Sequence, residues 1–163
     1  MRKCEPDDSQ SARVQALRAA LEHASIGSPM VQDIRATLWR RLLVNISGSV
    51  VCMLVERPVS VVSEVPAISD LFARLSREGA AVALANGVDV ERGAVPAGAV
   101  YRFPGHQKPS MLQDYERGRT MEIEGILMTP IAFARKGGVE TPAMDVVAAL
   151  ASARAAGKRL YSG

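Results

Sequence analysis

The sequence lacks the glycine patterns that bind nucleotides. No two of its 13 glycines stand two positions apart, so the fingerprint of a dinucleotide-binding strand, turn and helix is absent. The phosphate loop is absent too, since Gly93 and Gly98 have the required separation but Ala99 stands where that motif needs lysine. A complete Rossmann domain is therefore excluded, and we expect no cofactor-binding residues in this chain.

Metal ligands and activated nucleophiles are equally scarce. His23 and His106 lie far apart, and neither has a cysteine or a second histidine at ligand spacing, so we expect no metal site. Ser110 follows His106 by four residues, but no nucleophile elbow surrounds it, which excludes a serine hydrolase. Cys4 and Cys52 allow one disulfide at most, and this fits a reducing compartment better than a disulfide framework.

Excess charge and long apolar runs are missing as well. The sequence has 20 Lys and Arg against 17 Asp and Glu, a formal charge of +3, so we expect neither a nucleic-acid surface nor an anionic-membrane surface. No uninterrupted apolar run is longer than residues 50–55, which is far short of the roughly 20 residues that span a membrane. The N-terminal residues lack the apolar core of a signal peptide. A length of 163 residues fits one compact domain, which we expect to be cytoplasmic.

What the sequence does contain is a succession of helical patterns, which predict a mainly α domain. Gly48 weakens the middle of the long helix expected from Asp33. Pro130 is expected to kink the helix expected from Thr120, and Gly137 with Gly138 ends that helix. We expect residues 88–108 to be a connector or variable loop, and residues 26–31 to be the one extended piece. The polar residues expected to cap or begin the helices are Ser9 or Ser11, Asp33, Ser69, Ser110, Thr120 and Thr141.

Three runs of this sequence resemble the C-terminal half of ketopantoate reductases. They are residues 34–45 (IRATLWRRLLVN), 108–124 (KPSMLQDYERGRTMEIE) and 137–142 (GGVETP). The family pattern has an isoleucine-arginine pair, leucine-tryptophan, a basic pair and an asparagine on one long helix, and then a serine-methionine-leucine-glutamine-aspartate segment that leads to a glutamate. Each element occurs here in the same order and at matching spacing. The resemblance covers nearly the whole chain.

The resemblance implies a helical bundle like the C-terminal domains of 6-phosphogluconate dehydrogenases. Residues 1–31 look like a short αβ remnant of the preceding cofactor domain, a helix plus an extended piece, and residues 32–163 like the helical substrate and dimerisation domain. In the family a Rossmann domain that binds NADPH precedes this point. The chain therefore resembles a truncated, split or separately expressed portion of such an enzyme.

The resemblance also implies catalytic positions. Family members reduce a 2-oxo acid with NADPH, and a lysine on the long helix supplies a proton to the developing alkoxide. Arg41 stands at that position. A guanidinium keeps its proton above about pH 12, so arginine polarises a carbonyl but donates a proton poorly. Glu122 matches the glutamate that orients the lysine and the substrate hydroxyl, and we expect it to pair with Arg41 here.

Four further positions match substrate-binding residues of the family. Asn45, one turn beyond Arg41 on the same helix face, matches an asparagine that hydrogen-bonds the substrate, and Ser49 stands where a second asparagine is expected. Ser110 matches the serine that holds the substrate carboxylate, and at a helix start it would act together with free backbone amides. Asp114 matches an acidic residue of the same segment.

Two functions remain open at this point. The first is the substrate and dimerisation half of an NADPH-dependent 2-oxo acid reductase, converting ketopantoate to pantoate in pantothenate biosynthesis with a Rossmann partner from this or another chain, and inactive alone. The second is a non-catalytic helical dimer or 2-oxo acid binder derived from that family. Arg41 and Ser49 favour the second function, whereas the intact segment from Ser110 to Glu122 favours the first. Taken singly, each residue also has an ordinary structural interpretation, such as a helix cap or a solvated side chain.

Self-association is expected through the first helix. Val14, Leu17 and Leu21 form a face that would pack on the sheet of a full-length relative, and we expect no sheet in this chain to cover it. Because exposed apolar area costs about 25 cal/mol per Å², a second copy is the expected cover.

Overall fold

The computed structural model describes residues 5, 7, 9–91 and 108–161, and these are helical with no strand. The predicted mainly α class is thereby confirmed. Residues 26–31 are extended but join no sheet in the described part, because Pro29 lacks a backbone N–H and no second strand lies beside them. The helices, with η marking π-helical turns, are α1 (Ala12–His23), α2 (Ile34–Val44), η1 (Asn45–Ser49), α3 (Val50–Val55), α4 (Val59–Val62), α5 (Pro66–Ala85), α6 (Ser110–Glu116), η2 (Glu124–Met128), α7 (Thr129–Lys136) and α8 (Pro142–Gly157).

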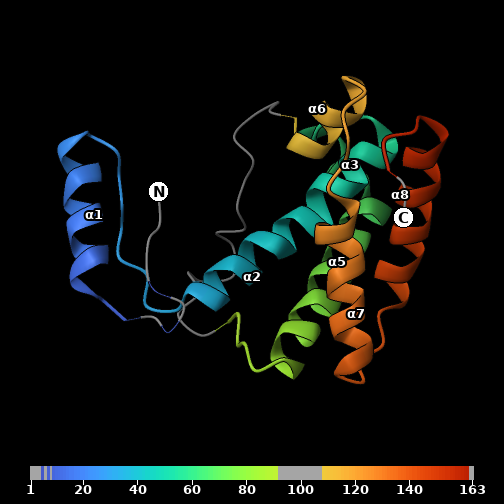
Figure 1. Ribbon diagram of the computed structural model, residues 1–163. Helices are drawn as coiled ribbons and strands as arrows, with labels where there is room; N and C mark the ends of the chain where they lie inside the picture. Colours follow the sequence, from blue (N-terminus) through green and yellow to red (C-terminus); the bar gives the residue numbers. More distant parts are fainter. Residues whose placement is uncertain (1–4, 6, 8, 92–107, 162–163) are drawn as a thin grey trace.

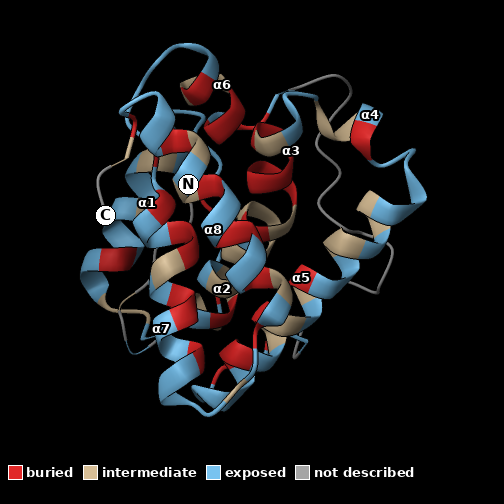
Figure 2. Ribbon diagram, turned by 90° about the vertical axis from the view of Figure 1, so that its right-hand side faces the viewer, coloured by how far each residue is buried: buried red, intermediate tan, exposed pale blue. Residues whose placement is uncertain are grey.

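One continuous helix, formed by α2, η1 and α3, runs through the middle of the molecule (Figure 1). Helices α5 and α8 pack along it, α7 packs on α5, and α6 lies at the end near α3. Figure 2 shows that buried residues lie on the helix sides that face one another. Helix α1 stands apart from this bundle, at the left of Figure 1, while α8 lies at the right.

Helix α1 is held by its own flanking residues. Ser11 is its N-cap as predicted, with Oγ accepting the Val14 N–H at 3.2 Å. Arg13 forms a 2.6 Å ion pair with Glu5, and the Arg18 guanidinium donates to the Ser28 carbonyl at 2.9 Å. These contacts attach the helix to neighbouring residues of the same chain, but they do not make it part of the main core.

The central helix changes its hydrogen-bond pattern in the middle. Asp33 caps its start as predicted, accepting the Ala36 N–H at 2.7 Å. Around Gly48 the pattern becomes π-helical, and the Val50 N–H donates to the Asn45 carbonyl five residues earlier. Ser47 Oγ donates back to the Leu43 carbonyl at 2.8 Å, a bond that bends helices. The weak middle predicted from Gly48 is therefore a π-helical turn.

This central helix, Ile34–Val55, is also long and apolar enough to cross a membrane by length and composition, since an 18-residue window within it has a mean hydropathy of 1.4. Counting only uninterrupted apolar runs missed this property, because the polar residues of η1 divide the segment. A buried core helix passes the same test of length and composition. In this structure Ile46, Val50 and Met53 are fully buried in the bundle core, as such a helix requires.

Two predicted helix starts, near Ser69 and Thr120, and the predicted N-cap at Ser110 are wrong. Helix α5 begins at Pro66, three residues before Ser69, because proline suits the first helical position. Ser110 is the first residue of α6 rather than its N-cap, which is Pro109. Thr120 caps nothing, since Met121 and Glu122 are not helical and the helix begins at Ile123.

The predicted helix ends agree with the structure. Gly87 and Gly138 adopt φ of +78° and +66°, the left-handed conformation that favours glycine after a helix. Before Pro130, η2 widens to a π-helical turn in which the Thr129 N–H donates to the Glu124 carbonyl. Proline has no N–H to offer the helix, and the disturbance expected at Pro130 takes this form.

The start of α8 is capped from another helix. Thr141 precedes Pro142 as predicted, but its side chain makes no capping hydrogen bond. Instead the Glu78 carboxylate on α5 accepts the N–H groups of Ala143 and Met144, at 2.9 and 2.8 Å. A carboxylate at this place satisfies two free amides and favours the positive end of the helix dipole. Glu78 thus fixes α8 to α5.

We expect Glu78→Ala to lower the free energy of unfolding by about 2 kcal/mol, because two amides of α8 lose a charged acceptor. Urea denaturation followed by circular dichroism measures the change. Glu64→Gln, an exposed carboxylate outside this contact, is the control and should change stability by less than about 0.5 kcal/mol. Equal stabilities for Glu78→Ala and the parent chain would show that α8 does not depend on this cap.

Candidate functional site

The two π-helical turns lie against each other, and the short helix α6 packs on the first of them. This arrangement brings together two of the runs that resemble ketopantoate reductases, residues 34–45 and 108–124, although more than 60 positions separate these two in the sequence. A π-helical turn inserts one extra residue into a helix and is common at functional sites. The surface around η1 is therefore the candidate site.

Asn45 and Ser49 stand at the two ends of η1 and contact each other. Ser49 Oγ donates to the Asn45 side-chain carbonyl at 3.4 Å. Ser49 is buried, whereas Asn45 is half-buried, so the amide group of Asn45 is the more accessible of the two. Ser49 thus orients Asn45, which keeps its NH₂ group as a donor for a ligand.

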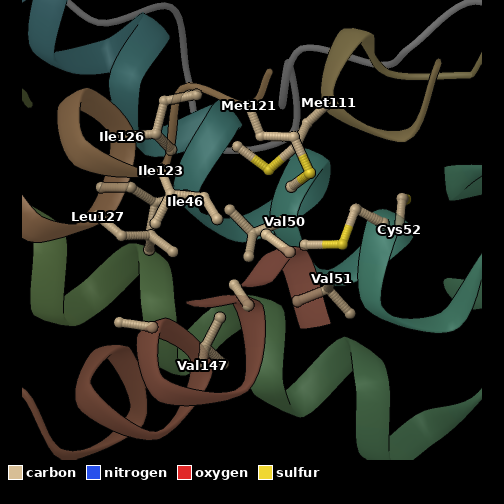
Figure 3. Close-up of a cluster of buried hydrophobic side chains, with 14 of the residues drawn as sticks. Ile46, Val50, Val51, Cys52, Met111, Met121, Ile123, Ile126, Leu127 and Val147 are labelled. Atoms are coloured by element: carbon tan, nitrogen blue, oxygen red, sulfur yellow. The ribbon is translucent and has the colours of Figure 1, made fainter. Parts of the chain in front are cut away.

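Two buried methionines pack where η1 continues into α3. Met111 on α6 and Met121 before η2 are buried, and Figure 3 shows both beside Val50, at the start of α3. Ile46 of η1 and Ile123 complete the contact and are fully buried. Because apolar burial holds α6 and the start of η2 on the central helix, the polar residues of all three segments keep fixed relative positions.

The residues on α6 are more open than those on η1. Ser110 is exposed at the first helical position, where backbone N–H groups have no helical partner. Asp114 is half-buried and forms a 3.8 Å ion pair with Arg119. Ser110 therefore offers a hydroxyl for an anion, while Asp114 is already paired within its own turn.

Arg41 and Glu122 are not paired, contrary to the expectation from the sequence. Both side chains are exposed, and neither takes part in an ion pair among the described residues. The physical reason is solvation: an exposed pair gains little over two separately hydrated charges, so nothing in this domain alone draws the two together.

One polar contact near η2 was missed by sequence reasoning. The Tyr161 hydroxyl donates to the Glu124 carboxylate at 2.9 Å, and this hydrogen bond raises the pKa of Tyr161 above its usual range. The Met121 N–H donates to the Leu160 carbonyl at 3.0 Å, so the C-terminal segment lies along the start of η2. No local pattern signals a contact between residues 37 positions apart.

The described residues contain no group of histidine, cysteine and acidic side chains that would hold a metal ion. Burial raises the pKa of the Cys52 thiol to about 12, so Cys52 is not a nucleophile. A dinucleotide does not fit the residues present either, because no two glycines have the two-position spacing with which a dinucleotide-binding turn opens onto its helix. The site therefore offers hydrogen-bond donors and positive charge to a small anion.

Comparison with known proteins agrees with these features. A model of the family described as ketopantoate reductase PanE/ApbA C terminal matches residues 33–155. A 2-dehydropantoate 2-reductase from Mesorhizobium japonicum is 32% identical over 97% of this chain and 48% of the relative. The chain thus spans about half the length of that relative.

Solved structures give the same fold. A 2-dehydropantoate 2-reductase from Geobacter metallireducens superposes with a TM-score of 0.77 and 27% identity, over 88% of this chain and 49% of that one. A dimeric ketopantoate reductase from Staphylococcus aureus gives 0.78 at 22% identity, over 96% and 54%, which shows the fold alone.

These comparisons place the helical bundle in one class of protein domain, the C-terminal domains of ketopantoate reductases. This chain belongs to the ketopantoate reductase family and carries its C-terminal domain.

We expect Arg41 and Glu122 to behave independently in the isolated chain. In a double-mutant cycle with Arg41→Ala and Glu122→Gln, the coupling in the free energy of unfolding should be below about 0.5 kcal/mol, because the two side chains are exposed and unpaired. Thermal or urea denaturation measures it. A coupling of about 1 kcal/mol or more would reveal a direct contact in solution.

Proposed function

We propose that this chain is the substrate-binding half of a 2-oxo acid reductase of the ketopantoate reductase type. Its substrate is ketopantoate or a similar 2-oxo acid, and NADPH binds to a cofactor domain on this or another chain. In this proposal residues 1–31 correspond to the end of a cofactor domain, residues 32–163 to the substrate and dimerisation domain, and the protein works in the cytoplasm.

The observation that carries the proposal is the convergence of η1, α6 and η2. Asn45 donates its NH₂ group to the bound acid, and Ser49 holds the amide in place. Ser110 donates its hydroxyl to the substrate carboxylate, beside the free N–H groups at the start of α6. Asp114 orients this segment through Arg119. A site that binds the substrate carboxylate needs hydrogen-bond donors, and no acidic side chain should point at that carboxylate.

In this proposal Arg41 and Glu122 contact the end of the substrate that reacts. Both are exposed, Arg41 four residues before Asn45 of η1 and Glu122 two residues before Glu124 of η2, and a bound acid and a cofactor domain would remove water from them. Desolvation strengthens the attraction between opposite charges, so the pair absent here would form in the closed complex. Arg41 then polarises the substrate carbonyl, and water or another acid supplies the proton.

A second candidate function is a 2-oxo acid binder that does not catalyse reduction. The observation that favours it is the exchange of the family's lysine for Arg41, since arginine is a poor proton donor. Self-association belongs to both candidates, and the dimeric relative from Staphylococcus aureus supports it.

Binding is tested by titrating the ¹⁵N-labelled chain with ketopantoate. We expect chemical-shift changes around Asn45, Ser49 and Ser110 and a dissociation constant of about 1–10 mM, weak because half of the binding site is missing. Asn45→Ala should weaken binding about tenfold through loss of one hydrogen bond to an anion. Gln15→Ala on α1 is the control. Shifts elsewhere, or none at about 50 mM, would contradict both candidate functions.

Turnover separates the two candidates. We expect no NADPH oxidation by this chain alone with ketopantoate, because it cannot position a dinucleotide against the bound acid. With the cofactor domain of a ketopantoate reductase supplied, the parent chain should be slow and Arg41→Lys at least about tenfold faster. Arg35→Lys, an exposed arginine of the same helix, is the matched control.

Oxidation of NADPH by the parent chain alone would contradict the proposal that this chain binds the substrate while a cofactor domain binds NADPH. Binding of ketopantoate without turnover, even for Arg41→Lys with a cofactor domain, would establish the non-catalytic binder instead.

A further inference from the structure

The chain turns back at the end of α8, so that residues 158–161, the C-terminal segment, return to the candidate site (Figure 1). The turn is a Schellman motif, in which the Leu160 N–H donates to the Ala155 carbonyl at 2.9 Å. Arg159 takes the left-handed position of this motif, with φ of +58°, where glycine is usual. Leu160, at 6% exposure, is buried in the core beside it. The turn therefore fixes where Leu160 and Tyr161 lie.

The C-terminal segment holds the residues on both sides of Glu122. The Leu160 carbonyl accepts the Met121 N–H at 3.0 Å, and the Tyr161 hydroxyl donates to the Glu124 carboxylate at 2.9 Å. Glu122 belongs to the short non-helical stretch before η2, and its side chain is exposed. Because burial does not fix this side chain, its place depends on how firmly its two neighbours are held.

The same segment also contacts α6. The Lys158 ammonium lies 3.7 Å from the centre of the Tyr115 ring, a cation–π contact with a buried residue of that helix. Helix α6 carries Ser110 and Asp114, which are placed at the substrate carboxylate in the proposed function. The C-terminal segment thus touches both of the segments that bring polar residues to η1.

We propose that Tyr161 is a positioning residue for Glu122, acting through Glu124 and the backbone that joins these two glutamates. By binding the Glu124 carboxylate, the hydroxyl keeps it beside the C-terminal segment, and Glu122 is left as the carboxylate that meets Arg41 in the closed complex. The inference rests on the proposed function, in which Glu122 contacts the reacting end of the substrate. A misplacement of about 1 Å at such a group can cost about 100-fold in rate.

Loss of the Tyr161 hydroxyl separates positioning from folding. Its hydrogen bond lies at the surface, where Glu124 is exposed and water competes for both groups. The segment is attached to the core by other contacts, the buried Leu160 side chain and the bond to the Met121 N–H. Tyr161→Phe should therefore leave the fold intact and change only how firmly residues 121–124 are held.

Steady-state kinetics test the inference in the Arg41→Lys chain supplied with the cofactor domain of a ketopantoate reductase. We expect Tyr161→Phe to lower kcat about three- to tenfold and to leave KM for ketopantoate within about twofold, because Asn45 and Ser110 still bind the acid. Its melting temperature should stay within about 2 °C of the parent value. Ser69→Ala is the control, since it removes another exposed hydroxyl bond, 2.8 Å long, far from η1 in the sequence.

A double-mutant cycle tests the route through Glu124. Glu124→Ala should lower kcat as much as Tyr161→Phe, and the double variant should be no slower than either, because all three lack the same hydrogen bond. Effects that multiply in the double variant would overturn this route. An unchanged kcat for Tyr161→Phe, a raised KM alone, or a loss of kcat that follows a lower melting temperature would overturn the inference.

Backbone relaxation of the ¹⁵N-labelled chain tests the same inference without turnover. The amide order parameter of Glu122 should be about 0.85 in the parent chain and in Ser69→Ala, and should fall toward about 0.6 in Tyr161→Phe. Equal values in all three chains would overturn the inference while leaving the proposed function intact. If no variant oxidises NADPH with ketopantoate, the proposed reductase function fails instead, and the order parameters alone decide whether Tyr161 positions Glu122.

Discussion

The structure depends on the central helix, formed by α2, η1 and α3, which is buried in the bundle at its C-terminal end and exposed to water at its N-terminal end. Along α2, η1 and α3, Val50 and Met53 are enclosed by the bundle, whereas Leu38 and Arg41 face water. The π-helical turn lies at the change between the two environments. It keeps the helix continuous while Asn45 and Ser49 take up positions at the surface of the core.

The second π-helical turn follows from the same constraint. Glu124 and Thr129 close a wide turn beside η1, and the buried side chains of Met111 and Met121 belong to the same core cluster that holds α6 against η1 and α3. Packing, rather than hydrogen bonding between site residues, therefore sets the geometry of the candidate site. This explains why Ser110 and Glu122 can remain exposed and unpaired in a well-ordered surface.

The chemistry that this surface offers is incomplete by itself. Its donors suit a carboxylate, and Arg41 supplies positive charge, but the residues present do not hold a dinucleotide. The relative from Mesorhizobium japonicum is about twice as long as this chain, which covers 48% of it, and in the proposed function a cofactor domain completes the site. A comparison limited to residue identity would have paired Arg41 with Glu122, a contact that hydration prevents in the domain alone.

The sequence by itself determined the helical class, the caps at Ser11 and Asp33, the glycine stops and the family, because periodicity and turn residues act over a few positions. It failed at Ser69, Ser110 and Thr120, where a hydroxyl is available for capping but neighbouring prolines or the packing of Met121 decide the boundary.

Only the tertiary structure decided that Glu78 caps α8, that Arg154 closes the end of α3, and that Tyr161 reaches Glu124. These bonds join residues 37 to 100 positions apart. They form because free amides, carbonyls and charges come together when apolar surfaces pack. No pattern in the local sequence predicts which of these groups will meet.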